Sequence, residues 1–412
     1  MKKEVLIYNS SAESLNIVGG KINSVRFNQE MRNTVRVYDD GKIAVVGKLG
    51  DADFKEMYDE ACKKIDGEGI PYAYLSSKKT VKSIARRKAY SFDKLLKAGK
   101  SLMAKAAKEC PGFLIGGKME YAEYSGQYVN SEGSNLSYEG SAVSVGLQLK
   151  DKASSNIMDA FYGATFPLYG KTAADAVVTD LKMLHDAFFT EKKPLKNGKY
   201  NIIVDSGDLF NLLASSFIAE NYVAGGSVLS GKLGQKIFNE NLSVYVDRNP
   251  STNYGCAFYD GEGTVMPDYR TPLILNGVMK NVLANKNTAK LYDLPQGGVS
   301  GSAYDGVPSI AVTGLYTKPS DITLKELTED EPAIYIAVSS GGDMTNDGVI
   351  GLPVMLAFLV ENGKISGRVS EFNATGNIFD ILGKDFVAVT KDNLFIAEKS
   401  GMIVVKADLI AG

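Results

Sequence analysis

Four side chains in this sequence can act as a nucleophile, as the base that activates one, or as a transition-metal ligand: His185, Cys62, Cys110 and Cys256. A zinc site built on two imidazoles needs two histidines, and a serine or cysteine nucleophile needs a base beside it. One histidine excludes the first arrangement within this sequence and makes the second depend on His185 alone. The scattered cysteines contain no C-x-x-C pair, so they predict no disulfide framework and favour a reducing compartment.

Glycines and carboxylates in loops offer two other kinds of chemistry. The run from Gly297 to Ser302 lacks the Gly-Lys-Ser/Thr ending of a phosphate-binding loop, and Gly225-Gly226-Ser227 follows a helix, so both are interpreted as tight loops. Val299-Ser300-Gly301 lacks the leading glycine of a G-x-S-x-G motif. A metal site made only of carboxylates stays open as a minor alternative to solvated, turn-forming side chains. Its candidates are Asp260, Glu262, Asp268, Asp343 and Asp347.

The elements that must position these side chains mix strands and helices in the first half of the chain. Alternating apolar residues predict strands up to Gly19-Gly20, over Ile22 to Phe27, and in a hairpin around Asp39-Asp40-Gly41-Lys42. Apolar spacing also predicts helices that begin after the caps Asp53 and Ser91. Further strands are expected over Met119–Tyr128, Ser141–Lys150 and Ile157–Phe166, with a helix over 172–188 that carries His185 on its flank.

Pro194 to Lys199 is the predicted linker, which divides the chain into an N-terminal domain, residues 1–193, and a C-terminal domain, residues 199–412. A strand and then one helix from Gly207 to about Tyr222 should follow it. Strand patterns dominate beyond that helix, with Asn-Gly turns at Asn276-Gly277 and Asn362-Gly363. The predicted later strands are Ile334–Val338, Phe386–Val389, Leu394–Ile396 and Met402–Ala407. The expected fold class is α+β, an N-terminal α/β domain with an antiparallel sheet and helices, followed by a β-rich domain.

The composition is that of an ordinary globular protein. The 412 residues carry 46 basic and 48 acidic side chains, a net charge of −2, and no long run of like charge, which argues against a nucleic-acid partner. The first residues lack the apolar core of a signal peptide, and no stretch reaches the length of about 20 apolar residues that spans a bilayer. We expect a cytoplasmic protein without a membrane partner.

An ordered series of short motifs in the second half resembles the TldD/PmbA family, whose members are called modulators of DNA gyrase or peptide-maturation proteases. The resemblance is best from Tyr200 to about Val389 and weaker in the first half, where Asn130-Ser131-Glu132-Gly133 and Gly20-Lys21-Ile22 continue it. The motifs that carry it include Ala224–Val228, Ser230–Gln235, Asp260–Thr264, Leu275–Lys280, Ala289–Leu291, Ser340–Asp343, Val360–Ile365, Val369–Glu371, Ala374–Asn377 and Gly383–Phe386.

This resemblance implies a cytoplasmic dimer that trims or degrades unfolded peptides in a shared cavity. The catalytic branch of the family carries H-E-x-x-x-H on the helix before the Gly-Gly-Ser-Val segment, plus a late cysteine, and these bind zinc. Counting back from Ser227 places the motif near 210–215, where this chain has Phe210-Asn211-Leu212-Leu213-Ala214-Ser215. Phe210, Asn211 and Ser215 are therefore degenerate metal-motif positions, and no catalytic residue can be carried over.

The PmbA (TldE) branch lacks the metal motif in the same way and pairs with a TldD-like subunit. The resemblance therefore implies a non-catalytic subunit of a metallopeptidase that processes unfolded peptides, with zinc only in its catalytic partner and no cofactor of its own. Two alternatives stay open: a self-contained hydrolase with a carboxylate site, and a homodimeric peptide-binding scaffold. The expected peptide or partner contacts lie in three loops, at Gly225, Gly226, Ser227, Gly298, Ser300, Gly342 and Asp343.

Overall fold

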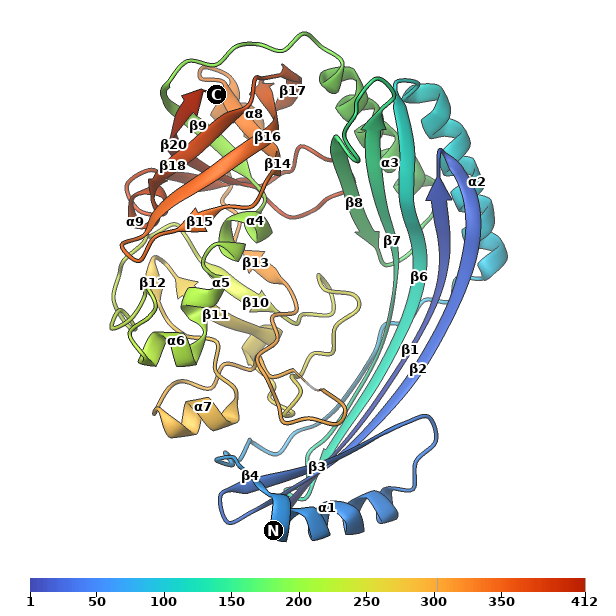
Figure 1. The fold of residues 1–412 in the computed structure, drawn as a ribbon, viewed down its shortest axis with the longest axis vertical. Coiled ribbons are helices and arrows are strands. Elements are labelled where there is room, and N and C mark those ends of the chain that lie inside the picture. The colour runs from blue at the N-terminus through green and yellow to red at the C-terminus, as the bar shows by residue number, and fades with distance from the viewer. Residues whose placement is uncertain (302, 412) are drawn as a thin grey trace.

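The structure is a computed structural model that describes residues 1–301 and 303–411. A long, curved sheet dominates its N-terminal half. Its strand order is β4-β3-β2-β1-β6-β7-β5, with β8 also paired to β7, and it runs along one side of the molecule (Figure 1). Only the short β5 runs parallel to its neighbour among the described pairings of this sheet, so the predicted antiparallel sheet is confirmed. The strands are β1 (Lys2–Val18), β2 (Lys21–Asp39), β3 (Lys42–Leu49), β4 (Ile70–Pro71), β5 (Val81–Ala85), β6 (Phe113–Asn130), β7 (Asn135–Asp151) and β8 (Ala160–Phe166).

The first three helices are those that the apolar spacing predicts: α1 (Phe54–Glu68), α2 (Phe92–Glu109) and α3 (Lys171–Phe188). The Asp53 carboxylate accepts hydrogen bonds from the backbone N–H groups of residues 55 and 56, and the Ser91 hydroxyl accepts one from residue 94, so both predicted caps are confirmed. The helix α1 lies against β2 and β3, whereas α2 and α3 pack together near the other end of the sheet (Figure 1). The helices thus bury opposite ends of a long sheet.

Several strands are longer than their hydrophobic pattern. The segments Ile22–Phe27 and Thr34–Tyr38 belong to one strand, β2, because the backbone pairing with β1 continues between them. Residues 23–29 of β2 are exposed on both faces, so they lack the alternation that marks a half-buried strand. The sequence pattern therefore detected only the parts of β2 that pack on other elements.

Five strands of the C-terminal half close into a small barrel. Their order is β14-β9-β20-β18-β16, and β16 pairs back to β14, which completes the ring; β14 and β9 are parallel, and the other pairs are antiparallel. Alternate residues face different cores, since Ile202 and Val204 of β9 point into the barrel while Ile203 packs toward the N-terminal half. The strands of this region are β9 (Gly198–Val204), β14 (Ala333–Ser339), β15 (Asp343–Met344), β16 (Val349–Glu361), β17 (Lys364–Arg368), β18 (Phe372–Asn377), β19 (Phe386–Val389) and β20 (Ile403–Ala411).

A separate four-stranded sheet lies beside the barrel, with the order β12-β11-β10-β13. Its β11–β12 turn has φ of 49° at Asn276 and 78° at Gly277, and the β16–β17 turn has φ of 50° at Asn362 and 73° at Gly363. Both turns need two positive φ values, which confirms the predicted Asn-Gly hairpins. The strands of this sheet are β10 (Val244–Asp247), β11 (Arg270–Leu275), β12 (Val278–Met279) and β13 (Leu315–Thr317). Other short elements of the C-terminal half are the 3₁₀ helix Pro267–Tyr269, α7 (Lys286–Leu291), α8 (Leu324–Thr328) and α9 (Ile378–Ile381).

The single helix predicted from Gly207 to Tyr222 is wrong. The chain forms three short helices instead, α4 (Ser206–Asn211), α5 (Ala214–Phe217) and α6 (Ala219–Val223). At the second break Ile218 is extended, with ψ of 128°, and the backbone groups around it pair with Leu283 through bonds of 2.7 and 3.1 Å. A long-range backbone pairing therefore outweighs the local helical pattern, which cannot reveal it.

The strand predicted at Leu394–Ile396 is also wrong, because this segment is a turn. Its backbone N–H groups at Ile396 and Ala397 donate to the carboxylate of Asp180, over 2.8 and 3.0 Å, so it docks on α3 rather than on a sheet. All strands of the first sheet precede the predicted linker, and the barrel strand β9 begins at its end, at Gly198, but one hydrophobic core spans both halves. The domain division at residues 193 and 199 therefore stays a prediction. No helix within the described residues is long and apolar enough to cross a membrane.

Candidate functional site

The barrel contains a cavity of about 320 Å³. All five barrel strands contribute apolar side chains to it, and α4 lies across its end (Figure 1). Four of the residues that line it, Asp208, Asn211, Ser339 and Gly341, are exposed, so the cavity opens to solvent beside α4. Its walls come from Ile202, Val204, Leu209, Leu212, Ile336, Ala337, Ile350, Leu352, Ala374, Ile381, Val405 and Ala407.

The degenerate metal-motif positions lie around this cavity but point in different directions. Phe210 is 3% exposed and belongs to the hydrophobic core behind α4, whereas Asn211 lines the cavity. Ser215 is exposed on α5, and its carbonyl accepts a hydrogen bond of 2.9 Å from Asn221. Because the helix is broken after Asn211, the three positions do not share one helical face.

The predicted contact residue Gly342 meets Asn211 at the same cavity. A Cβ atom on Gly342 would lie 2.8 Å from a methyl of Leu352 and 3.2 Å from a methyl of Leu212, so only glycine fits this wall without displacing them. Its neighbour Asp343 is exposed and pairs through its backbone with Gly351. The structure thus brings Asn211 and Gly342 together and leaves Asp343 on the rim strand β15.

The predicted loop at Gly225, Gly226 and Ser227 closes α6. Gly225 has φ of 76°, and the Gly226 N–H donates to the Asn221 carbonyl over 3.1 Å. The Ser227 hydroxyl is buried, donates to the carbonyl of Ser216 over 2.7 Å, and accepts from the backbone of residue 229. Ser227 therefore stabilises the helical region, while the two glycines stay exposed.

The third predicted loop lies in a buried polar network and does not line the barrel cavity. Gly298, with φ of 59°, approaches Met266 too closely for a side chain. Ser300 is 1% exposed, donates its hydroxyl proton to Glu262, and donates its backbone N–H to Asp260 over 3.0 Å. The end of this predicted loop, Ser302, lies outside the described residues.

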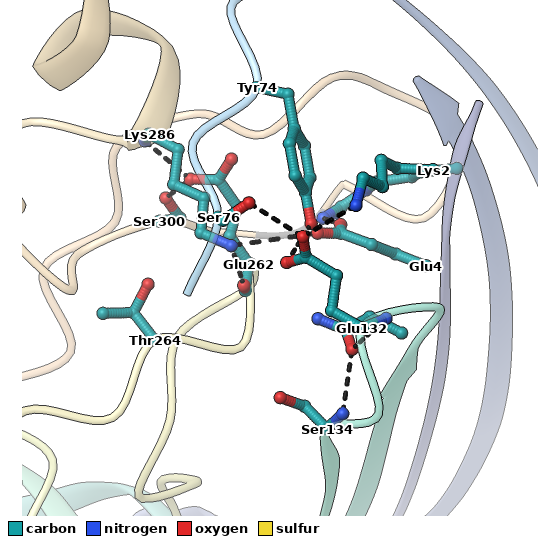
Figure 2. A network of polar contacts seen from close by, with 12 residues as sticks. Lys2, Glu4, Tyr74, Ser76, Glu132, Ser134, Glu262, Thr264, Lys286 and Ser300 are labelled. Atoms are coloured by element: carbon teal, nitrogen blue, oxygen red, sulfur yellow. Dashed lines mark hydrogen bonds and ion pairs between the residues drawn. The ribbon is translucent and has the colours of Figure 1, made fainter. Parts of the chain in front are cut away.

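This network joins the first strands of the N-terminal sheet to loops of the C-terminal half (Figure 2). Glu4 of β1 is fully buried and accepts hydrogen bonds from Tyr38 over 2.9 Å and from Tyr128 over 2.8 Å. It also forms ion pairs with Arg36 at 3.4 Å and with Lys286 at 3.9 Å. Because these partners come from β2, β6 and α7, Glu4 holds the two halves together.

Glu262 is the second buried carboxylate of the network. It accepts a 2.6 Å hydrogen bond from Tyr72 and a 2.8 Å bond from the backbone N–H of Lys286. Burial raises the pKa of Glu262, and the nearby carboxylates of Asp260 and Glu4 raise it further. The hydroxyl donors around it satisfy the oxygen atoms in the low-dielectric interior, which is the arrangement of a structural network.

The edge of the network reaches solvent at Glu132, part of the Asn130–Gly133 turn between β6 and β7. Glu132 accepts hydrogen bonds from Tyr74 and Ser76, over 2.9 and 2.8 Å, and pairs with Lys2 at 3.0 Å (Figure 2). Hydrogen bonds from these side chains lower the pKa of Glu132, although its burial acts in the opposite direction. This turn therefore anchors the segment 72–76 to the N-terminal sheet.

A larger cleft, of about 1250 Å³, lies between the two halves, and the sequence reasoning missed it. One wall is formed by 165–168 and the first turns of α3, and the other by 251–255, 313–316 and 396–400. Glu398 lies in this cleft, and burial, together with Asp205 and Asp180, raises its pKa to about 6. No motif marks the cleft, because its walls come from four separate segments. In the structure, the exposed apolar side chains of Leu168 and Ile396 mark it.

The loop carboxylates considered as a metal site do not gather in one place. Asp260 and Glu262 belong to the buried network, Asp268 lies within the 3₁₀ helix, and Asp343 and Asp347 lie near the barrel rim. Among the described residues, no group of three or more histidine, cysteine, aspartate or glutamate side chains is arranged to hold a metal ion. His185 lies on α3, where its Nε2 accepts a 3.3 Å hydrogen bond from the Gly112 N–H and its ring packs on Phe113 and Phe189.

Comparisons with known proteins agree with this architecture. The sequence profile of the PmbA/TldA metallopeptidase C-terminal domain matches residues 197–410, more than half of the chain. A metalloprotease of Methanothermobacter thermautotrophicus is 29% identical over 205 residues, and one of Methanocaldococcus jannaschii is 30% identical over 211 residues. These alignments cover 47% and 48% of this chain and 44% and 45% of the relatives, so the matched part spans less than half of their length.

The crystal structure of TldE from Thermococcus kodakarensis superimposes on the entire fold. The match covers 100% of this chain and 97% of that one, with a TM-score of 0.83 and 19% sequence identity. It confirms the α+β fold, with an antiparallel N-terminal sheet and a β-rich C-terminal half. Since the family profile spans the barrel with its cavity and the four-stranded sheet, the chain belongs to the PmbA/TldD metallopeptidase family.

Proposed function

We propose that this chain is a non-catalytic subunit of a cytoplasmic metallopeptidase, which pairs with a TldD-like catalytic subunit and helps to hold an unfolded peptide. The observation that carries the proposal is the identity of the side chains at the metal-motif positions. Phe210 belongs to the hydrophobic core and Asn211 lines an apolar cavity, on two sides of a helix that ends at residue 211. The zinc site of the His-Glu-x-x-x-His motif needs two imidazoles on one helix face, which these residues cannot supply.

The cleft between the halves is the proposed place for the peptide. Its volume of about 1250 Å³ exceeds the range of roughly 300–1000 Å³ that is usual for small-ligand pockets. The strand β13 ends the four-stranded sheet, and its Leu315 and Tyr316 line the cleft. An edge strand can pair with the backbone of any extended peptide, while Leu168 and Ile396 offer exposed apolar contacts.

Hydrolysis of an unfolded polypeptide tests the proposed division of labour. We expect the purified chain alone to leave reduced, carboxymethylated lactalbumin intact, and a mixture with a relative that carries His-Glu-x-x-x-His from the same genome to cleave it. Cleavage by this chain alone that disappears with Asp343→Asn or Asp347→Asn would instead establish the self-contained hydrolase. A chain that binds the polypeptide but never associates with such a relative would establish the homodimeric scaffold.

Binding of a fluorescent extended peptide tests the cleft itself. Leu168 and Ile396 are 47% and 66% exposed, so Leu168→Asp and Ile396→Asp should leave the fold intact and weaken the peptide's affinity. Ile157→Asp is the matched control, because Ile157 is 94% exposed and lies outside the cleft. Equal affinities for the cleft variants and the control would refute this peptide site.

A further inference from the structure

The barrel cavity has the form of a ligand pocket rather than a packing defect. Five strands surround it, and its apolar walls include Val204, Ile336, Ala374 and Ala407. Well-packed interiors leave few voids larger than a water molecule, so a cavity of about 320 Å³ is unusual in a barrel of this size. An engineered apolar cavity of about 150 Å³ already binds benzene. This cavity therefore has room for an aromatic ring and the atoms attached to it.

The opening of the cavity differs from its walls in charge. Asp208 of α4 is the charged residue among the described residues that line it, and Asn211 and Ser339 add uncharged polar groups. Burial, together with the nearby carboxylate of Asp208, raises the pKa of Asp205, the residue before the first turn of α4, to about 6. Two neighbouring carboxylates favour a cation or a hydrogen-bond donor at the opening and disfavour an anion.

We propose that this cavity binds a compact amphipathic cation, with a large apolar group inside the barrel and its ammonium group against Asp208. The N-terminal residue of a peptide has this chemistry when its side chain is aromatic or branched aliphatic. The inference rests on the proposed function, since it names the kind of peptide that the subunit would select. Gly341 and Gly342 leave their part of the entrance free of side chains, which suits a group that enters end-on.

Phenethylamine is the probe that separates the two requirements, because it joins a phenyl ring to an ammonium group. We expect it to bind the purified full chain at pH 7 in isothermal titration calorimetry and to raise the thermal unfolding midpoint. The anion 3-phenylpropionate, which carries the same phenethyl group, should bind about tenfold more weakly or worse, because it brings a carboxylate to Asp208. Ethylamine, which lacks the ring, should not bind measurably. Equal affinities for phenethylamine and 3-phenylpropionate would overturn the proposal.

Substitutions in the wall and at the opening locate the probe. Ala407→Phe places a phenyl ring in the wall and should abolish binding; Ala374→Phe serves the same purpose if the first variant does not fold. Asp208→Asn should weaken phenethylamine about tenfold, whereas Asp343→Asn, an exposed rim carboxylate that does not line the cavity, should change nothing. Undiminished binding by folded Ala407→Phe or Ala374→Phe would also overturn the proposal. Because these titrations use the chain alone, their failure leaves the pairing with a catalytic subunit standing.

Discussion

Removal of the Glu4 side chain is the sharpest perturbation of the network that joins the two halves. The Tyr38 and Tyr128 hydroxyls donate to the Glu4 carboxylate over 2.9 and 2.8 Å, and Glu4→Ala removes this acceptor. It also deprives Arg36 of an ion-pair partner at 3.4 Å, where both side chains are fully buried. Removal of one partner from a buried, hydrogen-bonded pair typically destabilises a protein by about 3–5 kcal/mol. We expect a loss in this range.

Urea denaturation followed by circular dichroism and by tyrosine fluorescence measures this loss. Glu56→Ala is the matched control, because Glu56 is 68% exposed and its ion pair with Lys48 is on the surface. Exposed pairs of this kind contribute at most about 1 kcal/mol. Since Glu4 connects the halves, its removal should also separate the unfolding transition seen by circular dichroism from the one seen by tyrosine fluorescence. A Glu4→Ala midpoint that matches Glu56→Ala, with coincident transitions, would refute the role assigned to the network.

Three further substitutions test other parts of the account. Burial raises the folded-state pKa of Glu398 to about 6, so the protein loses stability as the pH rises through that value and the carboxyl must ionise. Glu398→Gln should therefore stabilise the protein at pH 7.5 by roughly 1 kcal/mol, after allowance for partial exposure. The gain should vanish near pH 4.5 in thermal melts; a constant gain would contradict the shifted pKa. Gly277→Ala should destabilise the protein by about 1–3 kcal/mol more than Gly231→Ala. Both glycines have positive φ, but only a Cβ at residue 277 would lie 2.3 Å from a carbonyl oxygen. Equal melting temperatures would count against that contact. Asp180→Ala should destabilise the protein by about 1–3 kcal/mol and increase hydrogen exchange at residues 396 and 397, because it removes their acceptor. Asp175→Ala, at an exposed carboxylate of the same helix, should not increase it. Unchanged exchange in Asp180→Ala would exclude the docking role.

The fold could be predicted where the signal is local. The caps Asp53 and Ser91, the apolar faces of the first helices and the two Asn-Gly turns all act within a few residues, and the structure confirms them. The break at Ile218 could not be predicted in this way, because a backbone pairing with Leu283 causes it. Long-range pairing of this kind leaves no periodic signal in either segment.

The site could be predicted only in part for the same reason. Asn211 and Gly342 were both singled out from motifs, and the barrel brings them to one cavity. Ser300 was singled out as well, but its hydroxyl is used in a buried bond to Glu262. Neither the cavity nor the cleft between the halves has a sequence motif, because each is assembled from several segments that are separated along the chain by other elements.

Native mass spectrometry of the complex purified from the host tests the central claim most directly, because it gives the subunits and the metal content together. The account predicts a heterodimer of this chain with a relative that carries His-Glu-x-x-x-His. Zinc should follow that relative when the subunits are separated by collision in the gas phase. Stoichiometric zinc retained by this chain, whose metal-motif positions are Phe210, Asn211 and Ser215, would contradict the account.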